Sequence, residues 1–398
     1  MTIEMISETQ CTGCQACQTV CPYNAICFIQ NEEGFYVPQI NKLQCINCGK
    51  CYKICPTNQE YRKNVSEENY IVQLKKYSIS KKSASGGVFA GIAELFLKKY
   101  KGIVVGASLC DDLIVRHIII EKKEEIKRVQ NSKYVQSYMG NVYSLVKNEL
   151  CLGKKVFFTG TPCQVAGLYS VLSEKECENL YTADIVCHGV PSPAFLKRQL
   201  DEEAKDKKNK VINYKFRFKN PYCKSKSSYF MILMMKYGFP TVRKVVQDPY
   251  FNLFMKGMDF RESCYQCKYA NLNRVGDFTF GDCDSYQFYS NFHRNESNSI
   301  LLLNSEKAKV LWNDELKDKF DFSALDLERE AKYNHQLSYP SKRPSNRDGI
   351  YKKLLYEDWK IVKEEFSQPQ KKIDKYKLLI LSYTPKNLIR ILGKLKKY

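Results

Sequence analysis

The sequence predicts a small α+β domain at the N-terminus, followed by a larger α/β domain with a mostly parallel central sheet. Three observations predict this fold class. Cysteines in a doubled pattern occupy the first 56 residues, residues 58–69 show no apolar period, and strand–turn–helix units recur from about residue 100 onward. At roughly 150 residues per domain, a chain of 398 residues allows two or three domains.

Composition excludes several classes of protein. Hydrophobic residues make up 44% of the chain and charged residues 27%, which argues against a disordered chain and against a membrane protein. The longest apolar runs, such as 230–235, are too short to span a bilayer, and residues 1–10 do not resemble a secretory signal. We therefore expect a cytoplasmic protein, in which 18 cysteines indicate metal or redox chemistry rather than disulfides.

Eight of the cysteines form two copies of the pattern C-x2-C-x2-C-x3-C-P, offset by 34 residues. Three thiolates on one tight loop can bind three corners of a 4Fe-4S cube. In two-cluster proteins the fourth cysteine of each run binds the other cluster. We therefore expect a first set made of Cys11, Cys14, Cys17 and Cys55, and a second set made of Cys45, Cys48, Cys51 and Cys21.

The alternative for these cysteines is zinc, which favours two separated pairs and four ligands in all, so the doubled pattern fits it poorly. Cys27 lies outside the pattern and is interpreted as an ordinary buried cysteine. Residues 1–60 resemble bacterial two-cluster ferredoxins, which implies a ferredoxin-like α+β fold with two 4Fe-4S clusters. The polar stretch at 61–70 is predicted to be a linker.

The body begins near residue 71, and its first clear helix is predicted to start near Gly87, after a segment of small residues. Ser83, Ser85, Gly86 and Gly87 precede the apolar period of this helix. Small residues at a helix start can bind a phosphate or pyrophosphate through free backbone N–H groups. A plain serine N-cap is the alternative.

Strand–turn–helix units follow. The runs at 101–109, 154–160 and 181–187 are predicted strands; Thr161-Pro162 and Ser192-Pro193 are predicted helix starts. Repeated units of this kind imply a mostly parallel sheet, in which ligands gather beyond the carboxyl ends of the strands. Cys163 and Cys187 both follow predicted strands, so we expect them at the same edge.

Cys264 and Cys267 form a further C-x2-C pair, which by itself is ambiguous between zinc, iron–sulfur and redox use. Combined with Cys163 and Cys187 it completes a third set of four thiolates, which favours a third 4Fe-4S cluster. Unrelated buried cysteines are the alternative. That alternative is preferred for the cysteines without a companion motif: Cys110, Cys151, Cys177 and Cys223.

The order of motifs resembles the coenzyme F420 hydrogenase/dehydrogenase beta-subunit family over about 200 residues. The matching segments are SASGG (83–87), SKYVQS (132–137), GTPCQVAGL (160–168), CHGVPSP (187–193), CYQCKYA (264–270) and the stretch from Arg274 to Asp282. The resemblance implies an FAD-containing iron–sulfur protein with Cys163, Cys187, Cys264 and Cys267 as cluster ligands. It also implies flavin contacts from Ser85, Gly86, Gly87, Lys133, Thr161, Arg274 and Asp277.

One departure from the family pattern concerns the end of this stretch. An aromatic residue followed by Trp-Gly is common there, whereas this chain has Cys283, Asp284 and Ser285. A different substrate could therefore be accepted at this end of the site.

The resemblance implies hydride exchange between a reduced carrier, coenzyme F420 or similar, and FAD. Single electrons would then pass through the clusters to or from a redox partner, a ferredoxin or a reductase subunit. His188 is the candidate for moving a proton with the hydride, or alternatively for orienting its loop. His117 and His293 lack supporting context. The competing class is an electron-transfer module without its own substrate. No nucleic-acid motif accompanies the formal charge of +20.

Residues 341–398 are predicted to form a basic helical tail after a main domain spanning 71–340. The last 28 residues carry nine Lys or Arg and one Asp, and apolar residues recur at helical spacing at 388, 389, 392 and 395. A solvated terminal helix is the default interpretation; peripheral contact with an anionic membrane is the alternative.

Overall fold

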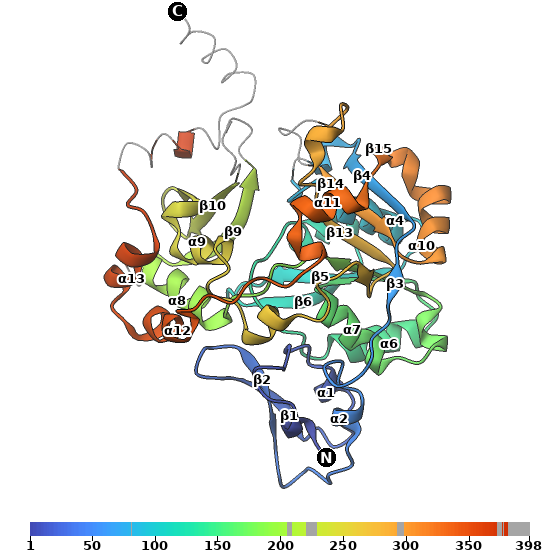
Figure 1. Ribbon diagram of the computed structural model, residues 1–398, viewed down its shortest axis with the longest axis horizontal. Helices are drawn as coiled ribbons and strands as arrows, with labels where there is room; N and C mark the ends of the chain where they lie inside the picture. The colour runs from blue at the N-terminus through green and yellow to red at the C-terminus, as the bar shows by residue number, and fades with distance from the viewer. Residues whose placement is uncertain are drawn as a thin grey trace, which may run out of the picture.

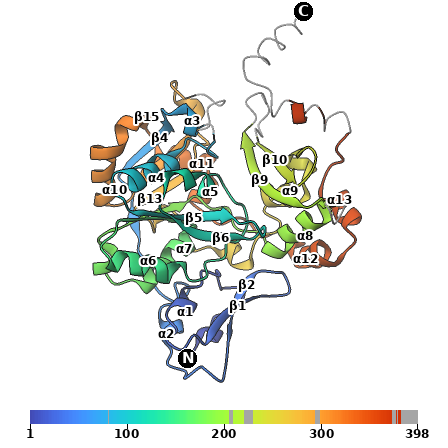
Figure 2. The same ribbon diagram turned by 180° about the vertical axis from the view of Figure 1, so that it is seen from behind.

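A computed structural model describes residues 1–80, 82–204, 209–219, 229–292, 298–371, 376 and 378–380. The N-terminal segment lies below a body made of two lobes (Figures 1 and 2). One lobe contains a large sheet covered by helices, and the smaller lobe contains the strands β9 and β10. In the described part of the chain no helix is long and apolar enough to cross a membrane.

The N-terminal domain repeats one backbone geometry around its two cysteine runs. Strands β1 (Ile26–Gln30) and β2 (Tyr36–Ile40) form an antiparallel hairpin, and the short helices are α1 (Ala16–Thr19) and α2 (Lys50–Lys53). Left-handed residues occur at Gly13 and Gln15 in the first run and at Asn47 and Gly49, 34 residues later, in the second. This conformation is unusual for non-glycine residues. Its recurrence shows that the sequence repeat is also a structural repeat.

The segment predicted to be a linker is held by the body. Strand β3 (Asn64–Val65) pairs with β12 (Asn273–Arg274), and the next strand, β4 (Glu68–Leu74), enters the large sheet. The Asn64 side chain also donates hydrogen bonds to the carbonyl oxygens of Val275 and Gly276. The connection between the two domains is therefore fixed in place.

The large sheet has eight strands in the order β15-β4-β14-β13-β8-β7-β5-β6. Its remaining strands are β5 (Ile103–Leu109), β6 (Val115–Ile120), β7 (Val156–Gly160), β8 (Leu180–Ile185), β13 (Phe278–Asp282), β14 (Ser299–Leu303) and β15 (Phe320–Ala324). Only the four central strands, β5, β7, β8 and β13, run parallel, and the four outer strands pair antiparallel.

The expectation of a mostly parallel sheet is thus right for its centre and wrong for its flanks. Parallel neighbours need a long crossover, usually a helix, whereas antiparallel neighbours can be joined by a tight turn. The crossover between β7 and β8 contains helix α7 (Pro162–Val171). Only residues 110–114 join β5 to β6, and these are too few for a crossover.

Helices cover both faces of the sheet (Figure 1). Helix α4 (Val88–Lys98) packs on one face, while α6 (Val142–Cys151) and α7 pack on the other. The pattern along β7 shows the alternation, because Phe157 is buried with the α4 layer and Phe158 with the α7 layer. The shorter helices of this lobe are α3 (Tyr77–Ser80), α5 (Ile126–Val129), α10 (Glu306–Leu311) and α11 (Leu327–Tyr333).

The predicted helix starts of α4, α7 and α8 (Pro193–Glu203) agree with the structure. Thr161 precedes Pro162 in a capping box, and the Ser192 hydroxyl accepts hydrogen bonds from the backbone of α8. Helix α4 begins differently, because Gly87 stands before it with φ of 90° and no side chain caps it. The serine N-cap considered for this helix is therefore wrong.

The smaller lobe was not foreseen from the sequence. Strands β9 (Val211–Lys219), β10 (Tyr229–Met235) and β11 (Thr241–Lys244) form an antiparallel meander. Helices α8, α9 (Pro249–Met255), α12 (Arg347–Tyr356) and α13 (Trp359–Phe366) pack with it. Because α12 and α13 bury Leu354 and Val362 here, residues 347–366 of the expected tail belong to the folded body. The apolar positions at 388–395 lie outside the described residues.

Candidate metal centres and the adjoining pocket

The second cysteine set surrounds a hollow at the far end of the N-terminal domain. Cys45, Cys48 and Cys51 line it together with Cys21 from the other run, and Ile26, Ile40 and Ile46 contribute to the lining. Cys48 is exposed and Cys51 is buried. The fold therefore brings the fourth cysteine of the first run to the first three of the second.

The first set lies deeper. Cys14, Cys17 and Cys55 are buried, and Cys11 is half-buried. Burial raises the pKa of Cys14 most, and the neighbouring thiols of Cys55, Cys11 and Cys163 raise it further. These four cysteines are thus close enough to act on one another, and Cys163 of the third set is also close.

The third set lines a pocket at the carboxyl ends of the parallel strands. Cys163 lies in the first turn of α7, Cys187 follows β8, and Cys264 and Cys267 come from the turn at 262–267. The Thr161 hydroxyl is 3.1 Å from the Cys163 sulfur. Burial raises the pKa of Cys163 to about 11 and that of Cys264 to about 12. The pocket therefore brings together four half-buried thiols that are distant in sequence.

Unpartnered donors around this pocket fit an anionic group. Among the described residues three buried polar atoms have no hydrogen-bond partner here: Gln136 Nε2, Arg261 Nη2 and the Tyr269 hydroxyl. Gln136 lines the pocket, and Arg261 is close enough to lower the pKa of Cys264 against the larger effect of burial. Buried donors are rarely left unpaired. A cluster with sulfide and thiolate sulfurs would supply acceptors.

The number and type of ligands in the cysteine sets fit iron–sulfur clusters. Within the described ranges, no three His, Cys, Asp or Glu side chains are arranged to hold one metal ion. Two of the three sets line a hollow, each with four sulfurs. Four thiolates around a hollow match the ligation of a 4Fe-4S cube.

The first set contacts both of the others. Cys17 and Cys55 share an apolar cluster with Cys51 and Cys21 of the second set. Cys14 shares a different apolar cluster with Cys163 and Cys267 of the third set, packed among α6 and α7. The three sets therefore form a series, with the first set in the middle.

Two hydrogen bonds fix the contact between the first set and the pocket. Arg261 Nε donates to the Cys11 carbonyl oxygen at 2.6 Å, and the Ser263 hydroxyl donates to the same oxygen at 3.0 Å. Both donors precede Cys264 by three residues or fewer. On the α7 side Gly167 leaves so little room that a Cβ would lie 3.1 Å from Cys14 Cβ and 3.2 Å from Cys14 Sγ.

His188 lies at the rim of the pocket. Its backbone oxygen accepts a hydrogen bond from the Ser341 hydroxyl at 2.6 Å, and its ring faces Phe254 at a centroid distance of 6.2 Å. Solvent reaches the ring, yet desolvation within the hollow lowers the pKa of His188, with the Asp282 charge opposing the effect. Asp282 itself pairs with Arg217 at 2.7 Å.

The residues expected to contact a flavin make a variety of contacts in the structure. Thr161 alone among them lines the pocket. Ser85 donates to the Asn298 carbonyl oxygen at 2.7 Å, and the N–H of Gly86 is already bonded to the Ser299 hydroxyl at 2.8 Å. Gly87 caps α4, and the Lys133 ammonium donates to three backbone carbonyl oxygens of residues 128, 130 and 131.

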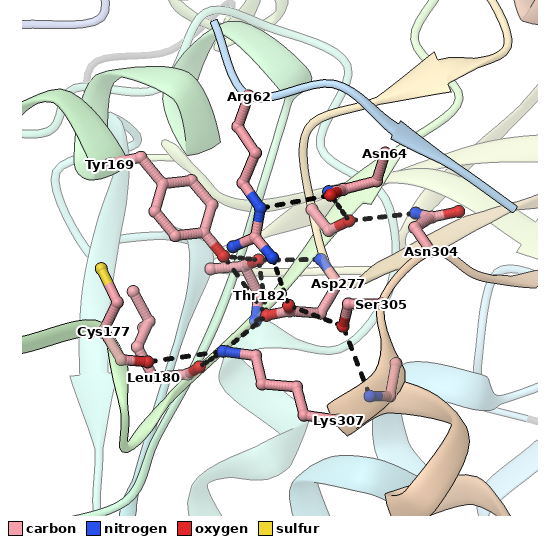
Figure 3. Close-up of polar contacts among 12 residues, drawn as sticks. Arg62, Asn64, Tyr169, Cys177, Leu180, Thr182, Asp277, Asn304, Ser305 and Lys307 are labelled. Atoms are coloured by element: carbon pink, nitrogen blue, oxygen red, sulfur yellow. Dashed lines mark hydrogen bonds and ion pairs between the residues drawn. The ribbon is translucent and has the colours of Figure 1, made fainter. Parts of the chain in front are cut away.

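Arg274 and Asp277 support the sheet and the linker. Arg274, 1% exposed, pairs with buried Asp184 at 2.7 Å. Asp277 accepts hydrogen bonds from Thr182 and from Ser305, and it faces Lys307 and Arg62 (Figure 3). Since Arg62 comes from the segment joining the two domains, Asp277 helps to anchor that segment on the body.

A buried polar chain behind the pocket escaped sequence analysis. Gln164 Nε2 donates to the Ser137 hydroxyl at 2.8 Å, and Ser137 contacts His117 Nδ1 at 2.9 Å. Gln164 Oε1 accepts from the backbone N–H of Thr161 at 3.0 Å, which positions the residue beside Cys163. The signal was present, because Ser137 and Gln164 each lie in one of the matching motifs. Burial lowers the pKa of His117 to about 4.

The doubled cysteine motif and the four-cysteine pocket at the strand ends define an iron–sulfur protein of the oxidoreductase class. Residues 153–327 match the family model for the C-terminal part of the coenzyme F420 hydrogenase/dehydrogenase beta subunit, and residues 6–63 match a 4Fe-4S dicluster domain. Residues 153–327 therefore belong to the coenzyme F420 hydrogenase/dehydrogenase beta-subunit family, and they follow a ferredoxin domain at the N-terminus.

No curated protein matches the chain. Among solved structures, one chain of the xenon-derivatised F420-reducing [NiFe] hydrogenase complex from Methanosarcina barkeri is similar to it at 15% sequence identity. The likeness covers 69% of this chain and 91% of that chain, with a TM-score of 0.45.

Proposed function

We propose that this chain exchanges a hydride between a reduced carrier, coenzyme F420 or a similar molecule, and FAD. Single electrons would pass through its 4Fe-4S clusters to or from a redox partner protein, a ferredoxin or a reductase subunit. The observation that carries the proposal is the series of three cysteine sets, in which the first set shares one apolar cluster with the second and another with the third. Membership of the family supports the same activity.

The proposal assigns each cluster to one set. The ligands are Cys11, Cys14, Cys17 and Cys55 for the first, Cys45, Cys48, Cys51 and Cys21 for the second, and Cys163, Cys187, Cys264 and Cys267 for the third. When bound, a 4Fe-4S cluster gains or loses one electron at a potential set by its charge, hydrogen bonds and solvent exposure. The protein therefore controls the reaction through what surrounds each set.

The surroundings of the second set differ from those of the third set. Around the second set Cys48 is exposed, so this set faces the solvent from which a partner protein would approach. Around the third set the thiols are half-buried in a pocket, and the spare donors of Gln136 and Arg261 fit an anionic occupant. A pocket at one end and an exposed cysteine at the other suit a protein that reacts with a small molecule in one place and a protein in another.

His188 is proposed to hold or move a proton near the pocket. The loop contact of His188 uses its backbone oxygen, and within the described residues its ring makes no hydrogen bond. The side chain is therefore available for chemistry. Replacing it with Asn should lower the rate by about 10²–10⁴ if the ring transfers a proton, and should leave the rate near wild type if it only orients the loop.

FAD is proposed from family membership and not from the residues expected to bind it. Those residues make other contacts, as described above, so the FAD part of the proposal rests on the family match alone. Bound FAD would convert between a two-electron hydride donor and one-electron carriers.

The test is anaerobic purification followed by FAD quantification and an assay of F420H2 oxidation with an artificial electron acceptor. About one FAD per chain and the appearance of the oxidised carrier's absorbance support the proposal. A protein that contains iron but neither binds FAD nor oxidises F420H2 would instead be a ferredoxin-type electron-transfer module. The His188→Asn variant is assayed beside wild type, to test the role of His188 at the rim of the pocket.

A further inference from the structure

We propose that the Tyr269 hydroxyl donates a hydrogen bond to a sulfur atom of the cluster held by the third cysteine set, and that this bond raises the reduction potential of that cluster. The inference rests on the proposed function, since it requires a cluster in the pocket. It adds a tuning residue that belongs to neither the cysteines nor the residues expected to bind a flavin.

The first observation is the unpaired hydroxyl itself. Tyr269 is 2% exposed, and in the part of the chain that the structure describes its hydroxyl has no hydrogen-bond partner. Leaving a buried polar group unpaired is costly. The Tyr143 hydroxyl, from the same apolar cluster, donates to the Gln164 carbonyl oxygen at 2.8 Å. The Tyr269 hydroxyl lacks such a partner, so an acceptor from a bound group would satisfy it.

The second observation is the position of this side chain. Tyr269 follows Cys267 by two residues and shares an apolar cluster with Cys14, Cys163 and Cys267. It thus lies where the third set meets the first. Sulfur atoms are the acceptors that both sets would bring to this position once loaded.

The third observation is that the ring is held. Tyr61 packs against it with ring centroids 4.7 Å apart, and the Lys268 ammonium lies 5.7 Å from its centroid. The Tyr269 backbone oxygen accepts a hydrogen bond from Arg274 Nη1 at 3.3 Å. With both ring and backbone fixed, the hydroxyl is not free to turn to solvent for a partner.

The expected effect on potential follows from charge. Reduction adds a negative charge to the cluster, and a donor hydrogen bond to sulfur stabilises the more negative state. Removing the hydroxyl therefore lowers the potential of the third cluster. The four cysteine ligands are unchanged, so we expect the cluster itself to be retained.

The test compares Tyr269→Phe with Tyr250→Phe in the full chain, loaded with clusters and titrated anaerobically while reduced-cluster signals are followed by EPR. Tyr250 is a matched control, because it is similarly buried and its hydroxyl donates to the Tyr134 carbonyl oxygen at 2.7 Å, in a different apolar cluster from the one that Tyr269 shares with Cys163 and Cys267. The third-cluster signal is identified by its loss in Cys264→Ser.

We expect Tyr269→Phe to shift the midpoint of the third cluster to lower potential, with Tyr250→Phe unchanged. An unchanged midpoint in Tyr269→Phe overturns the inference. A second measurement follows the hyperfine coupling of an exchangeable proton at the reduced third cluster. A coupling that is present in wild type and lost in Tyr269→Phe supports the hydrogen bond. A coupling that persists in Tyr269→Phe overturns the inference. Failure of the proposed function looks different, since wild type would then show no third-cluster signal.

Discussion

The N-terminal cysteine sets and the third set differ in how the chain builds them. The first two sets come from loops of eleven residues each, repeated with the same left-handed positions 34 residues apart. The third set joins Cys163 to Cys267 across 104 residues, through α7, the end of β8 and the turn at 262–267. The first two sets depend on local backbone geometry, whereas the third set depends on the whole sheet. We therefore expect the third set to lose its iron first when the body is destabilised.

The largest expected effect comes from the buried ion pair beneath the third set. Arg274→Ala removes the cation that faces buried Asp184, and it frees the backbone oxygens of Tyr269 and Asn271 near Cys267. Breaking a buried pair typically costs 3–5 kcal/mol, so we expect unfolding free energy to fall by about that amount. We also expect the third set to lose its iron while about eight irons stay in the N-terminal domain.

Thermal unfolding and iron analysis check this prediction, with Lys197→Ala as the control. Lys197 forms an exposed pair with Asp201, and such pairs contribute about 0–1 kcal/mol. Equal iron content in R274A and K197A would show that the third set does not depend on this pair.

Acid should also affect the third set before the other two. Buried His117 has its pKa lowered from 6.5 to about 4, so between these values the unfolded chain binds the extra proton and the folded chain does not. Stability is therefore lost as pH falls from about 6.5 toward 4, by about 3 kcal/mol in all. The Ser137 hydroxyl contacts the His117 ring and accepts a hydrogen bond from Gln164, which lines the pocket.

The measurement is the slope of unfolding free energy against pH between 5 and 7. His117→Gln removes the titrating group, so we expect a shallower slope than in wild type, and earlier loss of the third-cluster signal in wild type as pH falls. Identical slopes in the two proteins would contradict the role of His117.

A smaller effect is expected where the two regions meet. In Gly167→Ala the new Cβ would lie 2.9 Å from the Tyr143 hydroxyl and 3.1 Å from Cys14 Cβ. Overpacking of this kind costs about 1–3 kcal/mol. The domain contact should loosen, which weakens the magnetic coupling between the reduced first and third clusters.

EPR at low temperature measures this coupling, and Gly349→Ala is the matched control. Nothing lies within 4 Å of the Cβ position at Gly349, on α12, so that change should leave both coupling and fold intact. Undiminished coupling in G167A would mean that Gly167 does not set the contact.

The smallest effect is expected near the second cysteine set, in the N-terminal domain. Lys42 and Glu4 form a surface pair near the second set, and Lys42→Ala should leave the unfolding free energy close to that of wild type. Iron content should remain that of wild type. A loss of iron in K42A would show that the local loops are less self-sufficient than their repeated backbone indicates.

Features that depend on a few neighbouring residues could be predicted from the sequence. The cysteine spacing predicted which cysteines meet around the second hollow, and Thr161-Pro162 and Ser192-Pro193 predicted two helix starts that the structure confirms. Strand-end reasoning predicted that Cys163 and Cys187 lie at one edge, and both line the same pocket. Each of these depends on a few neighbouring residues or on one general rule of sheet topology.

Long-range features could not be predicted in the same way. The mixed sheet depends on short returns such as 110–114, and the lobe of β9–β11 depends on partners more than 100 residues away, including α12 and α13. Arg274 and Asp277 looked like ligand contacts because they stand in a motif. Their side chains instead pair with other buried groups, Asp184 and Thr182, which only the fold reveals.

The most direct measurement is the iron and sulfide content of the anaerobically purified chain beside that of Cys264→Ser/Cys267→Ser. We expect about twelve irons per chain in wild type and about eight in the double variant, because only the fold-assembled set would lose its cluster. About eight irons in both proteins would contradict a third cluster in the pocket.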